Sequence, residues 1–183
     1  MSASFNVYGL IIALSILICG LAVEYLAKRE SRETDIFWGA MFWTILFGVI
    51  GARIYHVIDL WEYYRQFPLQ VFSVWNGGLG IIGGIILGGA ALSTYLFVKK
   101  QNILEWLDLA ALTAPMGQAL GRWGNVANQE LLSLAYYEMV FDWVLFGVLL
   151  IIYSFLNPRP KGFILFTYLI GYTIVRIVLQ PMR

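Results

Sequence analysis

The sequence predicts an all-α integral membrane protein, a bundle of about six transmembrane helices with a short interfacial segment. Of its 183 residues, 60% are hydrophobic and only 13% are charged, and the mean hydropathy is +0.74. Soluble domains carry about 25% charged residues, so lipid is the expected solvent. A bilayer core about 30 Å thick needs roughly 20 apolar residues per helix. Residues 1–183 are therefore expected to form a single transmembrane domain.

The first two predicted helices cover residues 7–26 and 36–58, separated by the charged stretch KRESRETD. The first has neither a basic region before it nor a small-residue cleavage site, so we interpret it as a retained helix rather than a signal peptide. Residues 59–78 follow, where aromatic and polar residues are interleaved. This composition is typical of a segment that lies on the membrane surface. Its large aromatic residues are Trp61, Tyr63, Tyr64, Phe67, Phe72 and Trp75.

Four more apolar segments cover residues 79–98, 103–126, 136–156 and 163–179, and Pro158 and Pro160 mark the last loop. The segment 79–98 is rich in glycine. Small residues four positions apart let two helix backbones approach closely, so plain helix packing is the expected role of most of these glycines. They are Gly80, Gly83, Gly84, Gly88 and Gly89.

Positive charges indicate the topology. Lysine and arginine follow the first, third and fifth segments, and short loops rich in these residues face the cytoplasm. Both termini are therefore predicted to be extracytoplasmic. The residues that carry this prediction are Lys28, Arg29, Arg32, Lys99, Lys100, Arg159 and Lys161.

Three arginines fall inside the outer halves of predicted spans: Arg53, Arg122 and Arg176. Charges within a span are costly and usually mark function or pairing. Because a guanidinium binds phosphate through two parallel hydrogen bonds, a phospholipid headgroup is the expected ligand. For Arg53, snorkelling to the interface or an ion pair is an equally weighted alternative. For Arg122 the polar string GRWGNVANQE argues against a lipid-facing side chain.

Several other functions find no support. A net charge of +1 gives no sign of nucleic-acid binding, and no pattern calls for a metal or an organic cofactor. The single cysteine, Cys19, lies in an apolar run and predicts a buried thiol. A small transporter or channel ranks lower, because the two halves show no convincing repeat. A monomer is expected.

The string GRWGNVANQE at residues 121–130 resembles the signature of prolipoprotein diacylglyceryl transferases, G-R-x-G-N-F-x-N-x-E, with Val126 in place of phenylalanine. Further matches occur in the same order along nearly the whole chain. Val7-Tyr8-Gly9-Leu10 resembles W-Y-G-L, Gly51-Ala52-Arg53 resembles G-A/G-R, Trp75-Asn76-Gly77-Gly78 resembles W-D/E-G-G, Tyr137-Glu138 resembles the L-Y-E element, and Gly171-Tyr172 with Arg176 resembles G-Y-x-x-x-R.

The resemblance implies transfer of a diacylglyceryl group from phosphatidylglycerol to the thiol of a prolipoprotein lipobox cysteine, at the outer leaflet of the bacterial cytoplasmic (inner) membrane. The implied partners are phosphatidylglycerol, the prolipoprotein signal peptide and membrane lipids. The matching positions imply catalytic roles for Arg122, Arg176, Glu130 and Asn125, with the two arginines clamping the phosphate. They imply substrate binding by Tyr8, Arg53, Asn128, Tyr172, Gly77, Gly78 and Glu138.

The chain also departs from the family pattern. Ile82 stands where many members carry histidine or tyrosine, and the head that members insert before the L-Y-E element is missing between Glu130 and Tyr137. No general base is assigned. His56, three residues after Arg53, either replaces the side chain absent at Ile82 or is an interfacial residue without a catalytic role. The alternative function is a non-catalytic relative that binds phospholipid headgroups or lipoprotein signal segments.

Overall fold

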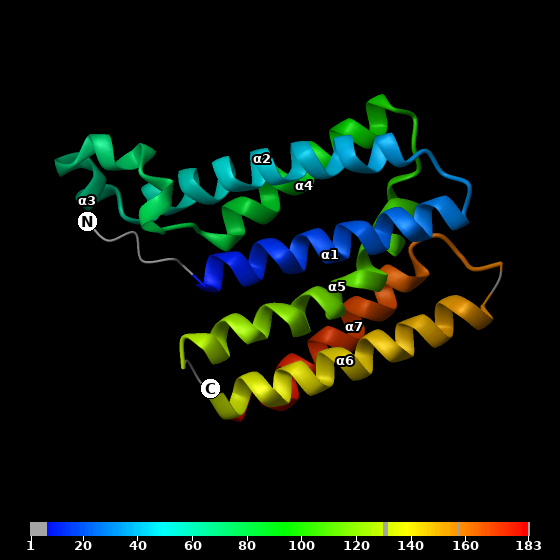
Figure 1. Cartoon of the computed structure of the whole chain (residues 1–183). Helices are drawn as coiled ribbons and strands as arrows, with labels where there is room; N and C mark the ends of the chain where they lie inside the picture. The colour runs from blue at the N-terminus through cyan, green and yellow to red at the C-terminus, as the bar shows by residue number, and fades with distance from the viewer. Residues whose placement is uncertain (1–6, 130–131, 157, 183) are drawn as a thin grey trace. The chain divides into compact units, whose positions relative to one another are not determined.

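A computed structural model describes residues 7–129, 132–156 and 158–182, and every regular element in them is helical (Figure 1). The predicted all-α fold is confirmed. The long helices are α1 (Val7–Arg29), α2 (Thr34–Asp59), α4 (Ile81–Val98), α5 (Ile103–Ala127), α6 (Leu132–Phe155) and α7 (Phe163–Leu179). The short ones are α3 (Trp61–Gln66) and the 3₁₀ turns η1 (Pro68–Phe72), η2 (Val74–Asn76) and η3 (Gln180–Met182).

Four of the described helices, α1, α2, α4 and α6, are long and apolar enough to cross a membrane. Helix α7 is apolar but has only 17 residues. Helix α5 carries Glu105, Asp108 and Arg122 within its length, which lowers its hydropathy. The membrane-protein class is confirmed, whereas the crossing of the bilayer by α5 and α7 stays a prediction.

Several helix boundaries differ from those predicted; α2, for example, begins at Thr34, two residues early. Helix α1 continues to Arg29, and α4 begins at Ile81 because Gly80 has an extended backbone (φ −86°, ψ 116°). Helix α6 begins at Leu132, four residues earlier than predicted, since Leu134 and Ala135 are buried. Glu138 therefore lies in the second turn of α6 and not at its start.

The chain divides into two compact units. Glu33–Ile103 form one, here called the hairpin unit, and Met1–Arg32 with Leu104–Arg183 form the other, here called the bundle unit. The expectation of a single transmembrane domain over residues 1–183 stays a prediction. Each unit is described below by itself.

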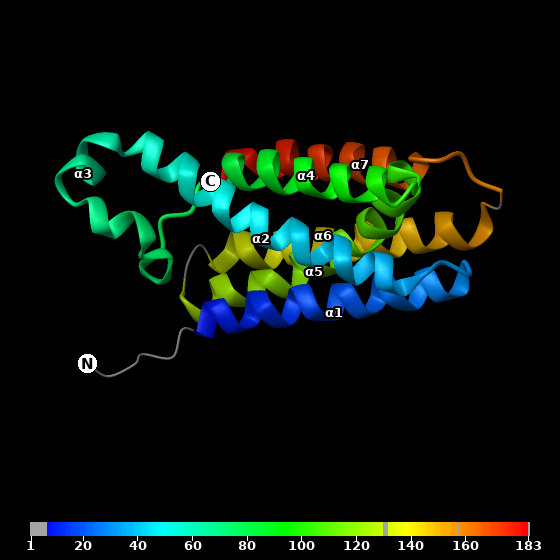
Figure 2. The ribbon, with the colours of Figure 1, turned by 90° about the horizontal axis from the view of Figure 1, so that it is seen from above.

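In the hairpin unit, α2 and α4 run side by side through a glycine interface (Figure 1 and Figure 2). Gly48 faces Gly84 and Gly88, and a Cβ on Gly83 would overlap the carbonyl oxygen of Gly51. The backbone N–H of Gly80 also donates to the carbonyl of Ala52 at 2.8 Å. The prediction that most of these glycines serve helix packing is confirmed for Gly83, Gly84 and Gly88, whereas a Cβ on Gly89 would meet no described atom within 4 Å.

In the bundle unit, α1 packs against α5 through small residues of the signature region. Gly117 contacts Cys19, Gly121 contacts Ile12, and Gly124 lies under the ring of Tyr8. A Cβ at Gly117 or Gly124 would come within 2.7 Å of its neighbour. The glycines at positions 121 and 124 thus have a packing reason as well as a place in the motif. Cys19 is half-buried.

The remaining helices of the bundle unit share an apolar core. Leu109 and Leu112 of α5, Leu149 of α6 and Ile164 of α7 are fully buried. The carboxylate of Asp108 accepts hydrogen bonds from the backbone N–H groups of Gly162 and Leu165, both at 2.8 Å. These N–H groups have no partner within α7, so α5 caps the start of α7.

The glycine interface of the hairpin unit gives a first prediction. Gly83→Ala places a Cβ against the backbone of Gly51, and overpacking of this kind costs about 1–3 kcal/mol, so the melting temperature in detergent should fall. Gly89→Ala in the same helix is the control, because no described atom lies within 4 Å of the position that a Cβ would take there. Equal stability of the two variants would contradict the packing role.

Candidate functional site

Two arginines in the bundle unit share one carboxylate. Glu138 of α6 is only 4% exposed. Its Oε2 lies 3.0 Å from Nε of Arg122 on α5, and its Oε1 accepts a hydrogen bond from Arg176 of α7 at 3.3 Å. The Arg122 contact is an ion pair without a well-directed hydrogen bond. These three groups are called the arginine cluster below, and they join α5, α6 and α7.

The arginine cluster can accept an anion. Two guanidinium groups share the one carboxylate of Glu138, and together they carry more N–H donors than that carboxylate can accept from. The side chains of Arg122 and Arg176 are 22% and 33% exposed, which keeps part of each guanidinium within reach of a ligand. Where water is scarce, an anion gains more from such groups than it does in bulk water.

Sequence reasoning missed Asp142, which lies one helical turn beyond Glu138 on α6. It is 2% exposed, and its Oδ2 has no hydrogen-bond partner among the described residues. Arg122 and Glu138 both act on it electrostatically. The sequence did contain a feature that points to Asp142. It lies four residues after Glu138, so the two acids share a helix face, inside a predicted span where acidic residues are rare.

The other predicted residues of the bundle unit come from α1, from the end of α5 and from α7. The ring of Tyr8 covers Gly124, next to the half-buried Asn125. Asn128 is exposed in the turn after α5. Tyr172, one turn before Arg176, stacks on Tyr168 with ring centroids 5.9 Å apart. Glu130 lies outside the described residues.

In the hairpin unit, Arg53 organises the loop between α3 and α4. It is 7% exposed and its guanidinium donates to the carbonyls of Val71 and Gly77 at 2.8 Å and of Gly78 at 2.9 Å. A further hydrogen bond reaches the carbonyl of Gln70. Burial of Arg53 against backbone carbonyls contradicts snorkelling, and no acidic partner of Arg53 occurs among the described residues. Its donors hold the loop through backbone carbonyls.

Gly77 and Gly78 are required by this arrangement. Both have positive φ angles, 82° and 73°, which glycine adopts without strain. A Cβ on Gly78 would overlap the ring of His56, and His56 also meets Tyr64 edge-on at 5.9 Å. The structure thus brings Arg53, His56 and the two glycines together. The gathering of Arg53 with Arg122 and Arg176 stays a prediction.

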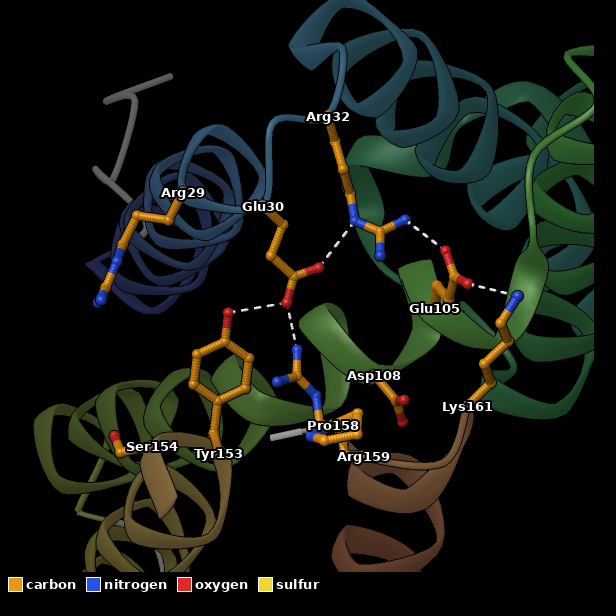
Figure 3. A pocket seen from close by; sticks show the side chains of 10 residues that line it. All are labelled: Arg29, Glu30, Arg32, Glu105, Asp108, Tyr153, Ser154, Pro158, Arg159 and Lys161. Atoms are coloured by element: carbon orange, nitrogen blue, oxygen red, sulfur yellow. Dashed lines mark hydrogen bonds and ion pairs between the residues drawn. The ribbon is translucent and has the colours of Figure 1, made fainter. Parts of the chain in front are cut away.

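A second polar cluster in the bundle unit lines a cavity of about 570 Å³ (Figure 3). Glu30 accepts hydrogen bonds from Arg32 at 2.8 Å and Tyr153 at 2.9 Å, and it pairs with Arg159. Glu105 lies 2.7 Å from both Arg32 and Lys161. This set of residues is called the loop clasp below.

The loop clasp joins segments far apart in the sequence, and it stabilises the ionised form of Glu30. Burial alone would raise the pKa of Glu30, but the hydrogen bonds from Arg32 and Tyr153 and the charge of Arg159 lower that pKa below its usual value. Sequence reasoning treated Arg32, Arg159 and Lys161 only as topology markers. Their acidic partners give them a structural role.

The fold and the arginine cluster define a helical membrane protein that carries paired charges within its helices. A family model described as prolipoprotein diacylglyceryl transferase matches residues 1–183, and the chain belongs to this family. The predicted resemblance is confirmed.

Three relatives, each named phosphatidylglycerol–prolipoprotein diacylglyceryl transferase, support the assignment. The protein from Lactiplantibacillus plantarum is 34% identical over 96% of this chain and 73% of its own length. The protein from Streptococcus equi subsp. zooepidemicus is 35% identical over 93% of this chain and 78% of its own length. The protein from Nostoc sp. is 31% identical over 96% of this chain and 74% of its own length. The L. plantarum alignment covers 209 residues, more than the 183 of this chain, so that relative has residues without a counterpart here.

The loop around Arg53 gives a second prediction. Arg53→Lys keeps the charge but loses the planar fork of donors, so several carbonyls lose their partners. A loss of about 1.4 kcal/mol in local stability corresponds to tenfold faster exchange. Hydrogen–deuterium exchange should therefore rise at least about tenfold in residues 68–80. Arg65→Lys, at an exposed position of α3, should leave exchange unchanged.

The loop clasp gives a third prediction. Because the folded state lowers the pKa of Glu30, its carboxylate stabilises the fold above the ordinary glutamate pKa of about 4.3. That contribution is lost as the pH falls through the folded-state pKa. Glu30→Gln should lower the free energy of unfolding by about 1–3 kcal/mol at pH 7.

Melting temperatures in detergent test this expectation. The gap between wild type and Glu30→Gln should narrow as the pH is lowered from about 5 towards 3. Glu62→Gln removes the same charge from an exposed position of α3 and should change little. A gap that is independent of pH would show that ionisation of Glu30 does not stabilise the fold.

Proposed function

We propose that this protein transfers the diacylglyceryl group of phosphatidylglycerol to the thiol of a lipobox cysteine in a prolipoprotein signal peptide, at the bacterial inner membrane. The observation that carries the proposal is the arginine cluster, in a chain that matches the transferase family over residues 1–183. The relatives' name specifies phosphatidylglycerol and a prolipoprotein. The substrate's own thiol is the nucleophile, so Cys19 has no part in the reaction.

The arginine cluster suits the chemical demands of this transfer. The reaction needs a group that binds a phosphodiester and stabilises the negative charge that develops on the departing glycerol phosphate. Arg122 and Arg176 provide planar donors for both tasks. When phosphate takes up these donors, it competes with Glu138 for them. We assign Asn125 and Glu130 to the orientation of Arg122 and of the headgroup.

The remaining substrate-binding roles follow from position. We assign Tyr8, Asn128 and Tyr172 to contacts with the lipid: Tyr8 packs on Gly124, close in sequence to Arg122, Asn128 follows α5, and Tyr172 lies one turn before Arg176 on α7. In the hairpin unit, Arg53 holds the loop of Gly77 and Gly78, which we also assign to substrate binding. The proposal includes a monomeric protein with both termini on the extracytoplasmic side, which is the side of the lipoprotein substrate.

A transfer assay tests the proposal. Purified protein in phosphatidylglycerol liposomes receives a lipobox peptide, and the mass of the peptide and the released glycerol phosphate are followed together. Wild type should add one diacylglyceryl group per thiol, and a peptide with serine in place of cysteine should stay unmodified. Arg122→Gln should lower kcat/KM at least about a hundredfold, the usual cost of removing a donor to a developing anion.

Two controls make the outcome specific. Arg65→Ala removes an exposed arginine from α3 and should leave the rate unchanged. Unfolding of Arg122→Gln is checked by its melting temperature. If wild type transfers nothing yet binds phosphatidylglycerol in an Arg122-dependent way, the alternative holds, and the chain is a lipid-binding relative without catalysis.

A further inference from the structure

The proposed transfer requires that the thiol of the substrate cysteine lose its proton. The sequence alone identified no side chain that accepts this proton. The thiolate reacts far better than the thiol, and a free cysteine is mostly protonated at neutral pH. The one histidine, His56, belongs to the hairpin unit, where it packs against Gly78 and Tyr64. The bundle unit contains no histidine. Within the bundle unit, carboxylates are the candidate proton acceptors beside Arg122 and Arg176.

Two of these carboxylates lie on one face of α6. Glu138 and Asp142 are four residues apart and 4% and 2% exposed, so neither is solvated as a surface acid would be. Glu138 has two arginine partners. Asp142 has no hydrogen bond to any described residue from its buried Oδ2. A buried polar atom without a partner is rare in folded proteins and calls for an explanation.

The charges around this pair determine what it can do. Facing it are Arg122 from α5 and, from α7, Arg176 and the hydroxyl-bearing Tyr168, on which Asp142 also acts electrostatically. Without a ligand, two positive and two negative charges balance. A phosphodiester that takes up the donors of the two arginines adds a negative charge and deprives Glu138 of counter-charge. Two neighbouring carboxylates then favour the uptake of one proton.

We propose that Glu138 and Asp142 together form the proton acceptor of the transfer. This inference rests on the proposed function. The S–H proton moves to a carboxylate oxygen of the pair, and the sulfur electron pair forms the bond to the glyceryl carbon. The bond from that carbon to the phosphate oxygen breaks, and its electrons leave on glycerol phosphate. The pair then gives its proton to the departing phosphate, which restores both carboxylates.

The pH dependence of the transfer assay tests the pair. Asp142→Asn should lower kcat/KM about a hundredfold at pH 7, in line with general base catalysis, without weakening the binding of phosphatidylglycerol. The defect should shrink towards pH 9.5, because the thiol, with a pKa of about 8.5, then ionises without help. Asp35→Asn makes the same change at an exposed position of α2 and should have no effect.

A merely structural Asp142 predicts a different result. The rate would then fall by the same factor at every pH, or stay at the wild-type value, and either outcome overturns the proposal. A peptide with selenocysteine, whose selenol ionises well below pH 7, should restore most of the Asp142→Asn rate at neutral pH.

Wild type provides a test that needs no variant. With an internal acceptor, kcat/KM should be nearly level between pH 7 and 8.5. A rise of about tenfold or more over that range, following ionisation of a thiol with a pKa of about 8.5, would show that solvent removes the proton, and would overturn the proposal. Absence of transfer by wild type at every pH would instead contradict the proposed function itself, so the two failures are distinguishable.

Discussion

The contact of Glu138 with Arg122 and Arg176 is the constraint on which the bundle unit depends. A charge buried away from water is tolerated only when it is paired and hydrogen-bonded. Because the three groups come from α5, α6 and α7, the helices must hold a mutual register that keeps them in contact. Close approach elsewhere supports this register: Gly171 of α7 lies against Leu145 of α6, and Gly124 of α5 lies under Tyr8 of α1.

The hairpin unit meets a related demand by other means. Two helices that touch through Gly48, Gly51 and Gly83 are joined by a segment in which Val71, Gly77 and Gly78 direct their carbonyls to Arg53. Backbone polar groups in an apolar surrounding need partners as much as charges do. Arg53 supplies five donors in a rigid fork, and positive φ angles at Gly77 and Gly78 bring their carbonyls to it. The single side chain of Arg53 thus satisfies loop carbonyls by hydrogen bonds, as backbone N–H groups satisfy carbonyls within a helix.

The limits of sequence reasoning follow from the same physics. Helices were predictable because hydropathy and glycine spacing are local properties, and the signature around Arg122 was found for the same reason. The interaction partners of the charged side chains could not be predicted, because they depend on tertiary packing. Arg32 contacts Glu105, 73 positions away, and Glu138 lies between two arginines from different helices. Asp142 was missed although four-residue spacing on α6 places it beside Glu138. Arg53 was placed correctly in α2, but its carbonyl partners follow only from the folded loop.

The two polar clusters of the bundle unit differ in a way that separates structure from function. In the loop clasp, Glu30 and Glu105 each have more than one cationic or hydrogen-bonding partner, and such a satisfied network favours one rigid arrangement. Beside the arginine cluster, by contrast, Asp142 keeps an unpartnered oxygen among the described residues. Folded proteins depart from full satisfaction mainly where function requires it. A satisfied network has no vacant acceptor, whereas a group that takes up a proton and later releases it needs a free oxygen in its resting state. Of the two clusters, only the one around Arg122 and Glu138 meets that condition.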